Sequence, residues 1–305
     1  MKYEIMRYKK RVYELLAILF MMGLVTLFAS KSSIYQPVAS QPNASGEEAL
    51  GAGALGAVTS GSGEERRISL IQATTLESDY KGMVMLGLAY TPYLEEEDLQ
   101  KAFDNVLRSC VRFQVKGHYG SGSIYKMTEN EIILVTNRHV LQYWNEDSYV
   151  TFFNGRVSEG MALGVSDEAD VGFVSISVEE FTYEELLFFR EIRMEQQRIG
   201  NGAKDLEIVI PEAGRKFFMV DMASEWNAPV MRQGEVVGAI LFLEDFQAEM
   251  LYGKGDAIPG MSGCGVFDGH GYYLGMLSGG TLQSEIAAVP AQTIDAAYEK
   301  IVKGK

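Results

Sequence analysis

Short apolar runs separated by glycine-bearing turns occupy most of the chain after residue 110. Val111, Phe113 and Val115 alternate with polar neighbours, which is the pattern of a half-buried strand. Further compact apolar runs lie at residues 132–136, 171–178, 216–221, 236–243 and 272–277. Many short strands at this spacing predict an all-β barrel or sandwich.

Three other segments have helical patterns. Thr91-Pro92 is predicted to open a helix, because proline suits the first helical position and the acids at 95–98 suit the positive N-terminal end. The apolar face of this helix would consist of Leu99, Phe103, Val106 and Cys110. Residues 183–197 predict a surface connection with helical character, and residues 294–302 predict an amphipathic C-terminal helix. In contrast, the apolar runs at 68–71 and 83–88 predict strands.

An uncharged apolar stretch, LLAILFMMGLVTLFA, fills residues 15–29. With its flanks it covers the 19 residues from 12 to 30, which at about 1.5 Å each span roughly 28 Å, enough for a bilayer core. Basic side chains in residues 1–11 predict a cytoplasmic N-terminus and an extracytoplasmic body. A cleaved signal peptide is the alternative, but cleavage after Ala29 would put Leu27 where a small residue is preferred. We therefore expect a single-pass signal-anchor in the cell membrane.

The region between this anchor and the strand-rich body divides in two. Residues 31–64 are rich in Ser, Gly, Ala and Gln and lack periodicity, so they predict a flexible linker. Residues 65–98 form a pre-domain segment whose structure the pattern leaves unassigned. Residues 99–305 form the predicted domain.

The chain is acidic, with a formal net charge of -14. Residues 1–14 carry five basic and two acidic groups, a net of +3, so the remainder carries -17. An acidic body argues against nucleic acid as a partner, because phosphate binding needs a basic face. The two cysteines, Cys110 and Cys264, are too few for a disulfide-stapled scaffold. Buried free thiols are their expected state, and a single bridge is the alternative.

A serine flanked by glycines is the first candidate for chemistry. Ser262 lies in the turn Gly260-Met261-Ser262-Gly263, and Pro259 stiffens the approach to it. A serine that attacks a carbonyl needs a base to take its proton and amides aimed at the developing oxyanion. Glycine two residues before the serine lets the backbone turn so that the amides converge. On its own, the same quartet is also common in surface loops.

One of the three histidines and one of two acids join this serine. His139 follows a compact apolar run, where an imidazole can face a cleft and act near neutral pH. His118 lies in a glycine-rich turn, and His270 lies at a predicted hairpin tip. Asp170 precedes another apolar run and would orient the imidazole, with Asp167 as its rival.

The order of these residues narrows the choice of fold. His139, Asp170 and Ser262 follow one another at separations of 31 and 92 residues. The α/β-hydrolase order is Ser, Asp, His, with the serine in G-x-S-x-G on a strand-to-helix elbow. Here Cys264 stands at the second position after the serine and strand signals follow, so that fold is disfavoured.

Several segments in order resemble the trypsin-like peptidase superfamily, and most closely its HtrA/Deg branch. Residues 120–124 (GSGSI) are similar to the family's Gly-Ser-Gly strand, and residues 136–140 (TNRHV) to its T-N-x-H-V. Residues 170–174 resemble D-L-A-V, residues 260–267 (GMSGCGVF) the G-N-S-G-G-P loop, and residues 269–275 the hairpin after it. Residues 288–290 (AVP) resemble the family's closing A-I-P, and Ile294 falls in its terminal helix. The match runs from about residue 99 to residue 302.

The resemblance implies two six-stranded antiparallel β-barrels of the chymotrypsin type, with a C-terminal helix and a site in the cleft between the barrels. It implies Ser262 as nucleophile, His139 as general base and then acid, and Asp170 as its orienter. The amides of Gly260 and Ser262 would form the oxyanion hole. Substrates would be proteins or peptides, and no metal or cofactor is implied. HtrA relatives often self-associate through N-terminal segments, which makes residues 65–98 a candidate for homo-oligomer formation.

The chain departs from the family pattern around the serine. Cys264 and Gly265 replace a glycine and a proline, and Met261 replaces a small polar residue; these positions would adjoin the cleft. Asp256 lies six residues before Ser262, where digestive members carry the acid that selects Arg or Lys. It is the candidate for the S1 pocket, and a solvated loop acid is the alternative. The PDZ domain that the HtrA branch usually appends is not expected here.

Three functions follow from these residues. The first is a membrane-anchored extracytoplasmic serine endopeptidase that acts through an acyl-enzyme in protein quality control or processing. The second is an inactive homologue that binds or senses peptides, and the third is a scaffold positioned by its linker. A nucleophilic Cys264, as in viral cysteine relatives of the fold, is disfavoured because those relatives have glycine where this chain has Ser262.

Overall fold

The computed structural model describes residues 79–198, 206–222 and 228–304. The predicted basic segment (1–11), anchor (12–30) and linker (31–64) lie outside these residues. In the part of the chain that is described, no helix is long and apolar enough to cross a bilayer.

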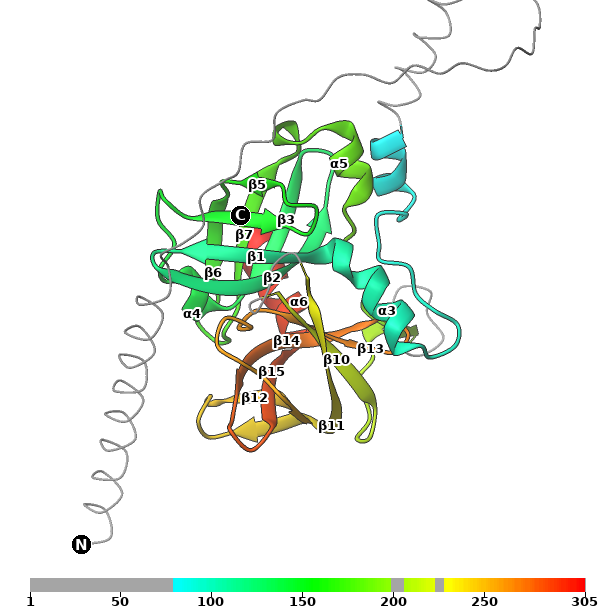
Figure 1. The fold of residues 1–305 in the computed structure, drawn as a ribbon, viewed down its shortest axis with the longest axis vertical. Helices are drawn as coiled ribbons and strands as arrows, with labels where there is room; N and C mark the ends of the chain where they lie inside the picture. Colours follow the sequence, from blue (N-terminus) through cyan, green and yellow to red (C-terminus); the bar gives the residue numbers. More distant parts are fainter. Residues whose placement is uncertain (1–78, 199–205, 223–227, 305) are drawn as a thin grey trace, which may run out of the picture. The chain divides into compact units, whose positions relative to one another are not determined.

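Seven antiparallel strands form the first sheet, drawn in green in Figure 1, in the order β5-β4-β1-β2-β3-β7-β6. Its core side chains include Phe113, Leu134 and Phe152, all fully buried. The strands are β1 (Cys110–Val115), β2 (His118–Met127), β3 (Glu131–Thr136), β4 (Tyr149–Phe152), β5 (Val157–Ser158), β6 (Met161–Val165) and β7 (Gly172–Ser177).

Six further strands close into a barrel in the order β10-β11-β12-β15-β14-β13, drawn from yellow-green to orange-red in Figure 1. Phe217, Met219 and Val266 are fully buried in its core. The strands are β10 (Lys216–Asp221), β11 (Val230–Leu243), β12 (Ala248–Gly255), β13 (Gly265–Asp268), β14 (Tyr273–Gly280) and β15 (Glu285–Pro290). A separate ribbon pairs β8 (Gln196–Arg198) with β9 (Leu206–Ile208).

The mostly β architecture and a closed six-stranded barrel are confirmed, but the first sheet differs from the predicted second six-stranded barrel. It has seven strands, and its ladder is open between β5 and β6. Strand β5 contains only two residues, and β6 pairs with β7 instead. At Gly160, between them, a Cβ would lie 2.3 Å from Val174 Cγ1, so the chain turns there with its backbone pressed against β7.

The helices beside the sheets include α3 (Leu99–Val106), α4 (Arg138–Leu141), α5 (Tyr183–Phe188) and α6 (Ala291–Tyr298), and residues 79–85 are also helical. A π-helical turn, Glu299–Lys303, continues α6, and 3-10 turns follow α3 (Leu107–Ser109) and β7 (Val178–Glu180). The predicted C-terminal helix is therefore present. Its Ile294 is fully buried in a core that both sheets share, with side chains such as Phe173 from the first and Phe218 from the second.

The first predicted helix begins later than its sequence pattern indicates. Helix α3 starts at Leu99, and Asp98 is its N-cap, accepting a hydrogen bond from Lys101 N–H at 3.0 Å. The residues before it are extended because their amides donate elsewhere. Leu94 N–H donates to the His270 carbonyl and Asp98 N–H to the Gly269 carbonyl, both at 2.9 Å. These contacts replace the bonds of a first helical turn.

Two other sequence predictions also need correction. Residues 79–85 are helical, so the predicted strand at 83–88 is wrong; Tyr80 of this helix packs on the first sheet, and its hydroxyl donates to the Thr128 carbonyl. Residues 183–197 are not all surface. Phe189 is 1% exposed and Glu191 3%, and the backbone of Glu191 pairs with Ala89 and Thr91. The helical character is confirmed by α5 (Tyr183–Phe188), whereas the residues after it form a partly buried, extended crossing that links the two sheets.

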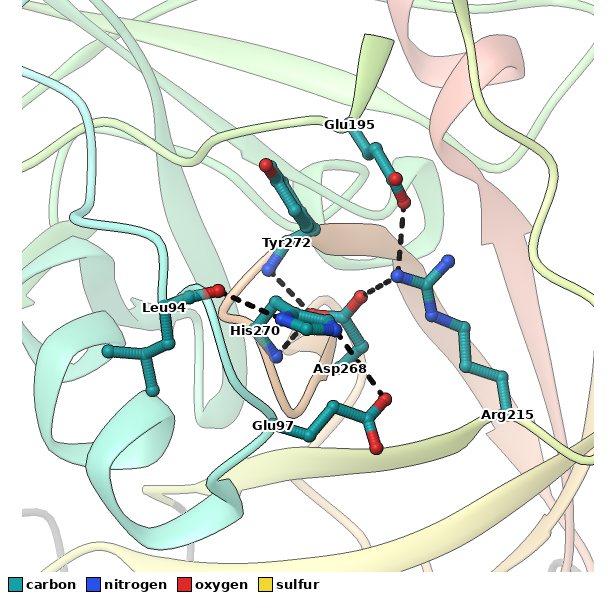
Figure 2. Close-up of polar contacts among 7 residues, drawn as sticks. All are labelled: Leu94, Glu97, Glu195, Arg215, Asp268, His270 and Tyr272. Carbon is teal, nitrogen blue, oxygen red and sulfur yellow. Dashed lines mark hydrogen bonds and ion pairs between the residues drawn. The ribbon is translucent and has the colours of Figure 1, made fainter. Parts of the chain in front are cut away.

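The β13–β14 hairpin holds the extended segment before α3, as Figure 2 shows. His270, at the predicted hairpin tip, has its Nδ1 2.8 Å from the Leu94 carbonyl oxygen. The carboxylate of Asp268 is fully buried and accepts the amides of His270 and Tyr272. It also pairs with Arg215. Because these partners satisfy the buried charge, the hairpin is a rigid support for the incoming chain.

A close backbone approach joins the two sheets. Ser121 N–H on β2 donates to the Ser262 carbonyl at 2.7 Å, and Ser121 Oγ donates to the Gly260 carbonyl at 3.0 Å. Thr136 Oγ1 donates to the Ser121 carbonyl at 2.7 Å. Gly263 has φ +91° and its Cβ would lie 2.0 Å from the Ser121 carbonyl oxygen, so only glycine fits there.

We expect Gly263→Ala to destabilise the protein by at least about 2 kcal/mol, because left-handed strain adds to a backbone clash. Gly214→Ala is the matched control: Gly214 has φ +90°, but its Cβ would meet nothing within 4 Å. Only the strain should remain, about 1–2 kcal/mol. Urea unfolding of both variants measures the difference, and equal losses would contradict the clash.

Candidate functional site

His139 and Asp170 are brought into direct contact. His139 lies in the one-turn helix α4, immediately after β3, and Asp170 lies in the bend before β7. His139 Nδ1 is 2.8 Å from Asp170 Oδ2, and His139 N–H donates to Asp170 Oδ1 at 3.0 Å. The strands β3 and β7 are paired neighbours, so their ends hold the two residues together. Since a carboxylate only accepts, Nδ1 carries the proton and Nε2 is left as an acceptor.

Local hydrogen bonds shape the bend that carries Asp170. Ser166 Oγ accepts the amides of Glu168 and Ala169 at 3.2 Å each, a serine turn that reverses the chain. Asn137 Nδ2 donates to the Asp170 carbonyl at 3.1 Å. The rival acid, Asp167, is exposed and contacts Arg138 through its backbone carbonyl. The geometry therefore favours Asp170 over Asp167 as the partner of the imidazole.

Ser278, on β14, is a further residue of the site that sequence reasoning missed. Its hydroxyl donates to Asp170 Oδ2. Burial alone would raise the pKa of Asp170, but the hydrogen bonds from His139 and Ser278 hold it below its ordinary value. The apolar run at 272–277 ends just before this serine, so the pattern assigned it to a turn. A polar residue at the end of a buried strand was the available signal.

The turn that holds Ser262 presents two uncommitted amides. Gly260 has φ +93°, a left-handed conformation that suits glycine. Within the described residues, neither Gly260 N–H nor Ser262 N–H donates to an acceptor. The other amides of the turn donate to carbonyls: Met261 to Ile258, Gly263 to Leu277 and Cys264 to Met261. The free pair is the pair that the sequence singled out.

Ser262 itself is half-buried, and its side chain makes no hydrogen bond to His139 among the described residues. Its neighbours do not adjoin the cleft as predicted. Met261 and Cys264 are 0% and 2% exposed, and both pack in the core of the closed barrel.

Both cysteines are free and buried, as the sequence predicts. Burial raises the pKa of Cys110 to about 12 and that of Cys264 well above its ordinary value. A buried thiol with a raised pKa is a poor nucleophile. The burial of its thiol therefore agrees with the prediction that Cys264 is not the nucleophile.

A cavity of about 550 Å³ opens beside the imidazole and is lined by His139, Asp170 and Ser278. Ser262 does not line this cavity. Asp256, the candidate for the S1 pocket, is exposed. It lines neither this cavity nor a second one, of about 450 Å³, which Leu243 and Phe246 line. In the part of the chain that is described, no three acidic, histidine or cysteine side chains gather as metal ligands.

Comparison with known proteins bears on the fold. No family model matches the chain, and no curated protein matches it. A solved structure of Rv3671c from M. tuberculosis H37Rv, a serine-to-alanine mutant in an inactive form, aligns with a TM-score of 0.52 and 13% identity over 70% of this chain and 97% of that one. The serine endoprotease from Yersinia pestis aligns with a TM-score of 0.52 and 16% identity over 69% of this chain and 68% of that one.

At these identities the likeness shows the fold alone. The chain has the chymotrypsin-like fold of the trypsin-like serine proteases, as its motifs predicted. A further structure, the inactive form of the Rv3671c protease, aligns with a TM-score of 0.48 and 14% identity over 68% of this chain and 98% of that one.

We expect Ser278→Ala to raise the pKa of Asp170. The variant loses a hydrogen bond that stabilises the carboxylate, while the burial that disfavours the charged form remains. A carboxyl with a lowered folded pKa adds stability above its unfolded pKa and loses it as the pH falls through the folded value. The variant should therefore lose stability near neutral pH and converge with the wild type in acid. Melting curves between about pH 2 and pH 7 measure this convergence.

Ser158→Ala is the control for this prediction, because its hydroxyl donates to the carboxylate of Glu180, away from the site. Its effect should leave the carbon-13 titration of Asp170 unchanged. An Asp170 titration that is the same in the Ser278 variant and the wild type would contradict the expected role of Ser278.

Proposed function

We propose that the protein is a serine endopeptidase in which Ser262 is the nucleophile, His139 the general base and Asp170 its orienting partner. The observation that carries this proposal is the pair of hydrogen bonds between His139 and Asp170, in a protein with the trypsin-like fold. The ring Nδ1 lies 2.8 Å from Oδ2, and the backbone N–H donates to Oδ1 at 3.0 Å. The free amides of Gly260 and Ser262 support the same assignment.

The proposed reaction is peptide-bond hydrolysis in two halves. Ser262 Oγ attacks the scissile carbonyl while His139 Nε2 takes its proton, and the amides of Gly260 and Ser262 stabilise the oxyanion. His139 then gives the proton to the leaving amine, which leaves an acyl-enzyme on Ser262. Water, deprotonated by His139, then attacks the ester carbonyl of the acyl-enzyme. The bond to Ser262 Oγ breaks, the proton returns to Oγ, and the peptide's new carboxylic acid leaves. Asp170 remains ionised throughout, consistent with its lowered pKa, and stabilises the imidazolium.

One observation favours a second candidate function, that of an inactive homologue that binds peptides. Ser262 and His139 are not hydrogen-bonded among the described residues, although both side chains are accessible. Resting peptidases can also hold these groups apart until substrate arrives. The two functions differ in turnover and not in peptide binding.

We further propose that residues 12–30 anchor the protein in the membrane, with the peptidase domain outside the cytoplasm and acting on exported proteins in quality control or processing. The uncharged stretch and the basic residues before it support this arrangement.

A fluorophosphonate probe should label the wild-type protein at Ser262, because only an activated serine attacks it. Ser262→Ala should abolish the labelling, and His139→Ala should reduce it by several orders of magnitude. Ser158→Ala, which alters a serine of β5 whose hydroxyl donates to Glu180, serves as the control and should label normally. A folded wild type that binds peptides but takes no label would favour the inactive homologue.

Full-length protein should stay with membranes through alkaline extraction, whereas a chain that starts at residue 31 should be soluble. Mass spectrometry of the membrane-bound form should find an intact N-terminal segment. A mature N-terminus close to residue 30 would instead establish a cleaved signal peptide.

A further inference from the structure

Phe246 lies in the turn between β11 and β12, where it covers a glycine of β14. A Cβ at Gly279 would lie 3.2 Å from Phe246 Cζ, so the ring occupies the space over that glycine. The turn is held by a hydrogen bond of 3.1 Å from Phe246 N–H to the Leu243 carbonyl. Gln247 next to it has φ 51°, which completes the reversal. The ring is therefore presented in a fixed place, one residue beyond Ser278.

Two cavities adjoin Phe246. One is the cavity of about 550 Å³ that His139 and Ser278 line. The other, of about 450 Å³, is lined on its apolar side by Leu243, Ile286 and Ala287, with Tyr252 and the glycines of β14. Phe246 lines both cavities and is 37% exposed, so part of its ring is open to a ligand.

We propose that Phe246 determines the specificity of the peptidase by forming one wall of a subsite for a bulky apolar side chain of the substrate. This inference rests on the proposed function and names its substrate class. The turn of Ser262 lies against β14 just before Ser278, since Gly263 N–H donates to the Leu277 carbonyl and Leu277 N–H to the Cys264 carbonyl, both at 2.9 Å. A peptide that reaches Ser262 along this end of β14 would bring a side chain near the scissile bond against the ring over Gly279. The second cavity has the volume for a leucine or phenylalanine side chain, and its burial there would favour binding.

The charges around the two cavities restrict the substrate further. Their acidic lining residues are Glu168, Asp245, Glu249, Glu244 and Glu285, besides Asp170. The only arginine or lysine that lines either cavity is Arg138, which already donates to the carbonyls of the bend at 166–167. Acidic peptides are disfavoured by this field, and the substrate is a neutral or basic peptide with one bulky apolar residue close to the cleaved bond.

Cleavage of a positional peptide library by the full-length protein tests the proposal. We expect one position near the scissile bond to favour Leu or Phe over Ala by on the order of ten-fold or more in kcat/KM. Phe246→Ala should reduce that preference to about two-fold or less, with the loss appearing mainly in KM. Phe246→Leu should restore most of it, which a merely structural role at this position would not predict.

Phe242→Ala is the matched control. Phe242 is on β11, the strand that leads into the turn of Phe246, and is 62% exposed, but it lines neither cavity. Phe242→Ala removes the same kind of side chain from a position outside both cavities, so the selectivity of this variant should equal that of the wild type. An apolar preference that survives Phe246→Ala, or that Phe242→Ala abolishes equally, would overturn the inference while leaving the peptidase function standing.

A binding measurement keeps the test independent of turnover. Ser262→Ala should bind a fluorescent peptide with Phe at the preferred position at least several-fold more tightly than its Ala counterpart. The double variant Ser262→Ala, Phe246→Ala should bind both peptides equally. Where no position is preferred because nothing is cleaved, a scan of Phe along a neutral peptide replaces the library. Equal binding of every peptide to the single variant would overturn the subsite, and absence of fluorophosphonate labelling alone would overturn only the peptidase function.

Discussion

The backbone contact between Ser121 and the turn at Ser262 is the constraint on which the candidate site depends. Strand and turn meet at 2.7 Å, and the missing side chain of Gly263 is what permits this distance. The same stretch of β2 is bonded to Thr136, which leads directly into His139. The turn and the segment that carries the imidazole are thus fixed relative to each other by a backbone contact and the Thr136 hydroxyl. The side chains of Ser262 and His139 can therefore change their contacts while the backbone that carries them stays in position.

The sequence identified those parts of the site that local patterns encode. His139 and Asp170 each stand beside an apolar run, and those runs became the paired strands that join them. Ser278 and Phe246 were missed because their roles depend on contacts between distant segments; Ser278 reaches Asp170 across 108 residues. The start of α3 was misjudged for the same reason. The propensity of Pro92 and the following acids for a helical turn was overridden by bonds to a hairpin far along the chain.

The fold class followed from strand spacing, but the closure of the first sheet did not. Whether a curled sheet closes depends on pairing at its two edge strands, and β5 is too short to reveal itself as an apolar run. Electrostatics shows a similar division. Composition gave an acidic body that disfavours nucleic acid, yet only the structure concentrates carboxylates around the cavities beside His139.

The hold of the β13–β14 hairpin on the segment before α3 has a consequence for the order of folding. Leu94 is among the first described residues to leave a ribosome, and His270, whose ring it binds, follows 176 residues later. The first sheet ends at β7 and can form early, but this contact and the closed barrel have to await nearly the whole chain. The strand that opens this hairpin starts three residues after Ser262. A chain that ends before this hairpin therefore lacks both the support and the turn, so the candidate site is assembled late in synthesis.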